Sequence, residues 1–229
     1  IIGLLAQPLV MQTCFRDPPA FAVERDHFEA GFFKQLFLAG KNAWVRTILL
    51  IAVVEGACVF GLLAITATHL HHKFGISLTI AGSTAALFGL GGMLYMATAK
   101  YTIRKFGETG LSRLGASGLS ISFLIIAFTP WWPLALPACF GGGFGFAMFH
   151  NTMQANATQM VPTARGTGVT LFAGFLFLGQ SIGVLMLANL LNHFSSSLVI
   201  ACASFVAIGL GFFLAHAIEK HQAHRKQTR

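Results

Sequence analysis

The placement of charged residues constrains this chain more than any other feature. Two stretches, 114–164 and 166–218, contain no Asp, Glu, Lys or Arg. Each is longer than the ~20 apolar residues that cross a bilayer as one helix, so each is expected to fold back as a helical hairpin. Only 10% of the 229 residues are charged, whereas about a quarter are charged in soluble domains. The sequence therefore predicts an integral membrane protein.

Apolar run lengths and turn residues predict an all-α fold, a six-helix membrane bundle. The turns between these helices are short, which leaves no room for a soluble domain in the bundle. The six expected spans are 48–68, 78–99, 111–129, 134–155, 167–191 and 197–217.

Basic residues lie almost entirely at one end of the expected bundle. Of the 15 Lys and Arg residues, only Lys73 falls in a turn at the other end. Six spans place both termini on one side, and the positive-inside rule makes that side cytoplasmic. The net charge of +8 thus indicates topology and not nucleic-acid binding.

The chain divides into three expected regions. Residues 1–43 are interpreted as the end of a preceding helix followed by a cytoplasmic linker, since the sequence starts at Ile1 with a short apolar run. Residues 44–218 form the bundle, and 219–229 form a basic cytoplasmic tail. We expect the native chain to continue upstream of Ile1.

Neither a metal site nor a cofactor is expected. Three of the four cysteines fall in separate apolar spans, without the spacing of metal ligands. His69, His71 and His72 crowd one turn, which we interpret as an exposed polar loop and not as a zinc site, because zinc needs three or four converging ligands.

Glu55 is the only acidic residue inside an expected span. It lies roughly 10–14 Å from the cytoplasmic end of the ~30 Å hydrocarbon core. A carboxylate at that depth is costly, so it should face the bundle interior and be paired or protonated. We interpret Glu55 as a candidate proton carrier. Counting by three and four residues puts Leu62, Thr66 and His69 on the same face, which would line a polar path.

The fourth span ends in the densest polar cluster of the membrane region. His150, Asn151 and Gln154 are interpreted as sharing one face and lining a substrate cavity. Gln180 lies near the middle of the fifth span, between Gly179 and Gly183, where small residues favour close helix packing. Gln180 therefore has two interpretations: a further residue of the substrate cavity, or a residue that helps neighbouring helices pack.

Two segments resemble a known family. The basic loop Lys100-Tyr101-Thr102-Ile103-Arg104-Lys105-Phe106-Gly107-Glu108 is similar to the loop motif of the major facilitator superfamily, although it lacks the motif's Asp. The segment Pro162-Thr163-Ala164-Arg165-Gly166-Thr167, followed by spaced glycines, is similar to that family's penultimate helix. With Asn151-Thr152-x-Gln154, it resembles bacterial arabinose and drug efflux permeases.

This resemblance implies the C-terminal six-helix half of a twelve-helix secondary transporter. It implies a cavity between two halves and alternating access by rocking. The family's cavity-lining helices would carry Glu55, His150, Asn151 and Gln154. A cytoplasmic gate would include Lys100, Arg104, Lys105, Gly107, Arg165 and Gly166. The expected partners are a proton, a small sugar- or drug-like substrate, the lipid bilayer and a missing N-terminal half.

Two other functions are kept open. Gly115-Ala116-Ser117-Gly118 matches the serine motif of rhomboid proteases, so an intramembrane serine hydrolase with a nearby histidine base is one alternative. A self-contained six-helix channel or scaffold is the other. We favour a non-enzymatic, proton-coupled efflux transporter.

Overall fold

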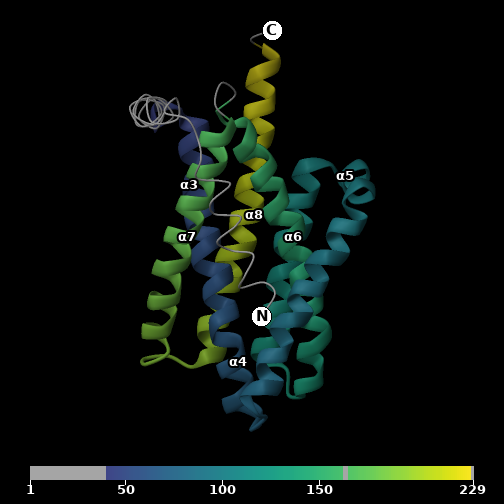
Figure 1. The fold of residues 1–229 in the computed structure, drawn as a ribbon, viewed down its shortest axis with the longest axis vertical. Coiled ribbons are helices and arrows are strands. Elements are labelled where there is room, and N and C mark those ends of the chain that lie inside the picture. Colours follow the sequence, from purple (N-terminus) through teal and green to yellow (C-terminus); the bar gives the residue numbers. More distant parts are fainter. Residues whose placement is uncertain (1–39, 162–164, 228–229) are drawn as a thin grey trace, which may run out of the picture. The chain divides into compact units, whose positions relative to one another are not determined.

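The computed structural model describes residues 40–161 and 165–227. The chain separates into two compact units, Ile1–Asn42 and Ala43–Arg229. Most of the region expected to form a linker, 1–43, lies outside the described residues. The described part of the second unit is a bundle of helices and contains no strand (Figure 1).

The first span is longer than expected and has an irregular middle. It consists of α3 (Ala43–Glu55), a π-helical turn η1 (Gly56–Phe60) and α4 (Gly61–Phe74), which together run unbroken through 32 residues. The helix continues through the turn that was expected at His69–His72 and ends where Gly75 takes a left-handed conformation, φ 67°. The expected exposed loop is thus helical.

The second and third expected spans are two helical arms that meet at Gly107 and are labelled together as α5 (Leu78–Phe128). Its chain reverses at Gly107, whose φ of 64° and ψ of 177° are accessible almost only to glycine. The rings of Phe88 and Phe123 lie 6.3 Å apart, although a straight helix would separate them by about 52 Å. The expectation of a basic loop at Lys100–Glu108 is wrong, because Gly107 alone makes the reversal and both flanks stay helical.

The remaining helices follow the sequence prediction more closely. A short 3-10 turn, η2 (Trp132–Leu134), leads into α6 (Ala135–Gln159), and α7 (Arg165–Leu190) follows. The last helix, α8 (Ser196–Gln227), extends about ten residues beyond the expected span. Among the described residues, five helical segments are long and apolar enough to cross a membrane, the first of them made of α3, η1 and α4 together. The reversal at Gly107 divides α5 into two spans.

Both arms of α5 pack against α6, and the second arm also packs against α8. On the other side of the bundle, α7 packs against α3, η1 and α4. We define the basic end as the end of the bundle that holds Gly107, the start of α7 and the end of α8, at the top of Figure 1. The opposite end holds Lys73 and the turn between α7 and α8.

Candidate functional site

The site is centred on Glu55, the last residue of α3. Glu55 lies twelve residues into its span, about 18 Å along the helix axis, and its side chain is completely buried. The π-helical turn η1 follows immediately, and such turns in α-helices frequently mark functional sites. The sequence correctly placed an acidic side chain inside the bundle.

His150 of α6 is the partner of Glu55. Its Nδ1 and Glu55 Oε1 lie 3.1 Å apart and share a hydrogen bond. The rings of Phe146 and Phe172 lie 5.0 and 5.6 Å from the His150 ring, on α6 and α7. The pair therefore sits between aromatic walls that limit access of water, and only a fifth of the His150 side chain is exposed.

Two buried oxygen atoms near this pair have no hydrogen-bond partner within the described residues. They are Glu55 Oε2 and Gln180 Oε1. The backbone nitrogen of Gln180 lies 2.9 Å from the point where a Cβ on Gly56 would stand, so α7 passes directly beside the residue after Glu55. A buried acceptor without a donor is costly, and a proton, a donor on a ligand or a water molecule would satisfy it.

Glycines bring α7 this close to α3. A Cβ on Gly179 would lie 2.7 Å from Val53 Cα, and one on Gly183 would lie 2.6 Å from the carbonyl carbon of Ala57. Real Cβ atoms do not approach other atoms so closely, so only glycine fits either position. The close packing expected from Gly179 and Gly183 is therefore confirmed. It holds the backbone of Gln180 beside Gly56, the residue after Glu55.

Thr66 and His69, which were expected on the Glu55 face of the first span, make their side-chain hydrogen bonds to groups other than Glu55. Thr66 donates to Leu62 of its own helix at 2.7 Å. His69 is buried and bridges to Ser196 Oγ at 2.7 Å and to the Ile126 carbonyl at 3.2 Å, on α8 and α5. The π-helical turn explains the difference, since one extra residue rotates everything after it by about 100° relative to Glu55.

The other polar residues of α6 lie apart from the pair. Asn151 bonds to the Ala147 carbonyl at 2.8 Å and reaches Met96 on α5, so it points to a different neighbour from His150. Gln154 is half-buried and makes no side-chain hydrogen bond among the described residues. It lies one turn from His150 on the same face of α6, as the sequence indicated.

The expected gate residues are exposed at the basic end. The side chains of Lys100, Arg104, Lys105 and Arg165 form no hydrogen bond or ion pair within the described part of the chain, and Lys105 Nζ lies 5.7 and 5.3 Å from the rings of Tyr101 and Phe106. Gly166 is exposed beside Arg165 at the start of α7. Instead, Arg113 bonds to Glu219 at 2.7 Å and joins α5 to α8. Sequence reasoning missed this pair. The sequence feature that could have indicated this pair is Glu219, a lone acidic residue directly after the uncharged stretch 166–218.

Ser117 does not form a catalytic pair. Within the described residues, its side chain makes no hydrogen bond to a histidine or to any other group. Likewise, the described residues contain no cluster of three or more His, Cys, Asp or Glu residues that could hold a metal ion. These observations give no support to a serine hydrolase.

Comparison with models of known protein families shows to which family the chain belongs. The model of the Major Facilitator Superfamily matches residues 1–184, which include Glu55, His150 and Gln180. The chain belongs to the Major Facilitator Superfamily. It is thus a multi-pass membrane protein and a transporter of the major facilitator type, not an enzyme. A search of curated proteins and a search of solved structures returned no match.

Proposed function

We propose that this transporter is proton-coupled and exports a small sugar- or drug-like molecule, with the proton exchanged at Glu55 and His150. One observation carries the proposal: a completely buried carboxylate in mid-span bonds to a histidine and keeps its second oxygen unpartnered among the described residues. Ionisable groups inside membrane spans are expensive, and those of transporters serve as proton relays and substrate contacts.

The pair can hold one proton or two without rearranging its backbone. With one proton, a glutamate and an imidazolium form an ion pair, or a carboxylic acid faces a neutral imidazole. A second proton leaves a carboxylic acid beside an imidazolium, with Glu55 Oε2 free to carry the added hydrogen. Water entering from one side of the membrane favours charged forms, and closure favours neutral ones. Alternating exposure in a proton gradient would therefore let the pair take up a proton on the side of lower pH and release it on the other.

The remaining parts of the proposal concern the surroundings of the pair. We place His150, Gln154 and Gln180 along a substrate cavity that faces a second six-helix half. The exposed basic residues around Gly107 and Arg165 would belong to a gate at the basic end. From their positive charge we infer that the basic end faces the cytoplasm in a bacterial inner membrane, and we expect both termini on that side.

Proton binding can be tested without knowing the substrate. Infrared difference spectra of the membrane-reconstituted protein, recorded between acidic and neutral pH, report protonated carboxyl groups through their C=O stretching band. We expect Glu55→Gln to remove a band that Glu219→Gln leaves in place, because Glu219 is an exposed acid at the basic end. His150→Asn should move the pH at which the band changes. A band that persists in Glu55→Gln would refute the assignment.

Coupling needs a transport assay. In membrane vesicles with an imposed pH gradient, radiolabelled arabinose and ethidium serve as a sugar-like and a drug-like probe. Gradient-driven movement of whichever probe the protein carries should be lost in Glu55→Gln, while exchange without a gradient continues. Gradient-dependent transport equal to that of the unmodified protein would remove Glu55 from the coupling mechanism.

A further inference from the structure

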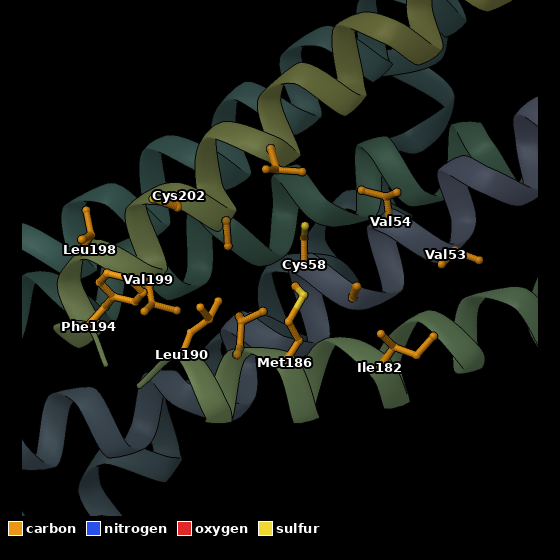
Figure 2. A pocket seen from close by; sticks show the side chains of 14 residues that line it. Val53, Val54, Cys58, Ile182, Met186, Leu190, Phe194, Leu198, Val199 and Cys202 are labelled. Carbon is orange, nitrogen blue, oxygen red and sulfur yellow. The ribbon is translucent and has the colours of Figure 1, made fainter. Parts of the chain in front are cut away.

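A lateral cavity lies away from the Glu55–His150 pair, between α7 and α8. These two helices are consecutive, yet within their described residues they make almost no direct contact with each other. The space between them measures about 440 Å³ and is floored by the end of α3 and by η1. Its volume falls in the ~300–1,000 Å³ range of small-molecule sites. Figure 2 shows side chains from α3, η1, α7 and α8 around this gap.

The cavity has a buried floor and an exposed rim, and both are apolar. Cys58 and Ala203 contribute to the floor and are less than a tenth exposed. Ile182, Met186 and Leu198 belong to the rim and are each about half exposed. No charged, amide or hydroxyl side chain of the described residues lines the space. Water needs two to four polar partners to occupy a cavity, so this one does not suit water.

The cavity lies within one leaflet. Its lining residues on α7 run from Ile182 to Leu190, which is about 12 Å of helix and less than half of the ~30 Å core. On α8 they run from Leu198 to Val206, over the same length. Both ranges adjoin the turn between α7 and α8, which lies opposite the basic end. The cavity therefore lies in the leaflet on that side of the membrane.

The lining and the depth of the cavity select an apolar occupant. A volume of about 440 Å³ with an entirely apolar lining suits an apolar molecule of small-ligand size. The side chains at the rim are apolar and exposed. In a membrane protein, exposed apolar side chains at this depth contact the acyl chains of lipids. An empty gap would forfeit dispersion contacts along every wall.

We infer that this cavity binds one acyl chain of a phospholipid from the leaflet opposite the basic end. The head group would lie near Phe194 at the turn between α7 and α8. The end of the chain would reach Val54 and Cys58, on the span that carries Glu55. The site is independent of the proposed proton exchange, since it rests on the membrane span and the cavity alone.

Photo-crosslinking tests the inference on the full chain. The protein is reconstituted in vesicles of phosphatidylethanolamine and phosphatidylglycerol with a trace of phosphatidylcholine that carries a diazirine on one acyl chain. Adducts are mapped by mass spectrometry. A diazirine near the carbonyl should label Phe194 and Leu198, and one near the methyl end should label Cys58 and Ala203. This order along the cavity is the expected result.

Two variants and a control make the test specific. Ala203→Leu places a larger side chain on the floor, so labelling there should fall to the level of the exposed helix faces. Ala86→Leu, an exposed site at a similar depth on α5, should leave the labelling unchanged. Leu190→Ala widens the cavity and should preserve or raise it, which keeps the test informative if Ala203→Leu does not fold.

Three results would overturn the inference. Adducts spread evenly over all exposed helix faces would show that no site exists. Floor labelling unchanged by Ala203→Leu would place the chain elsewhere. Adducts on the exposed helix faces but none on the residues that line the cavity would show that another polypeptide segment fills it.

Discussion

Replacing Gly179 by alanine should weaken the packing of α7 against α3. The added Cβ would stand 2.7 Å from Val53 Cα and closer still to the Val53 carbonyl oxygen. Ordinary carbon contacts begin near ~3.5 Å, so the two helices must separate by at least about 0.8 Å. Overpacking of this kind costs about 1–3 kcal/mol.

The matched control is Gly174→Ala on the same helix. A Cβ there meets nothing within 4 Å. Both substitutions gain about 0.5–1 kcal/mol because alanine loses less backbone freedom than glycine in a helix. This gain cancels in the comparison, so the difference in unfolding free energy between the two variants should remain about 1–3 kcal/mol.

The chain provides its own reporter for the measurement. Cys58 and Cys139 are free and buried, so a thiol-reactive dye reports thermal unfolding in detergent. For a chain of this size, the expected difference corresponds to a midpoint about 2–12 °C lower for Gly179→Ala than for Gly174→Ala. Equal midpoints for the two variants would refute the close approach of α3 and α7.

Three further predictions use the same dye assay. Gly107→Ala should destabilise by about 1–3 kcal/mol because φ 64° with ψ 177° strains any other residue, whereas Gly89→Ala, in open space, should not; equal effects would refute the reversal at Gly107. The exposed Arg113–Glu219 pair should show a coupling of no more than about 1 kcal/mol in a double-mutant cycle, and a larger value would contradict its exposure. Ser112→Ala should lose about 1 kcal/mol, because its buried hydroxyl donates to a carbonyl of α8 at 2.7 Å; no loss would argue against that bond.

The sequence predicted the helices and the burial of Glu55 because both follow from composition along the chain. Charge-free stretches locate spans, and a lone acid within a span must turn inward. The same reasoning singled out His150. It did not predict that the two side chains bond to each other, since that depends on the relative depth and rotation of α3 and α6, which no local pattern encodes.

The errors have local physical causes. Face counting from Glu55 to Thr66 and His69 assumed an unbroken α-helix, and the π-helical turn at Gly56–Phe60 changed the phase between them. The loop expected around Gly107 followed from its charges, yet basic side chains remain compatible with helix at a membrane surface. The substrate, the direction of transport and the coupling ion leave no local pattern of this kind in the sequence.

The one-residue reversal in α5 has a practical consequence for mapping how the protein sits in its membrane. An epitope inserted at Gly107 would have no loop residues on either side, so it would unwind a turn of each helical arm. The turn between α7 and α8 offers a better position, because Leu191–Ser195 lies between two helix ends and Phe194 is half exposed. A tag there reports the face opposite the basic end, and a tag after α8 reports the basic end. Antibody access to the two tags in intact and opened cells would orient the bundle without disturbing its packing.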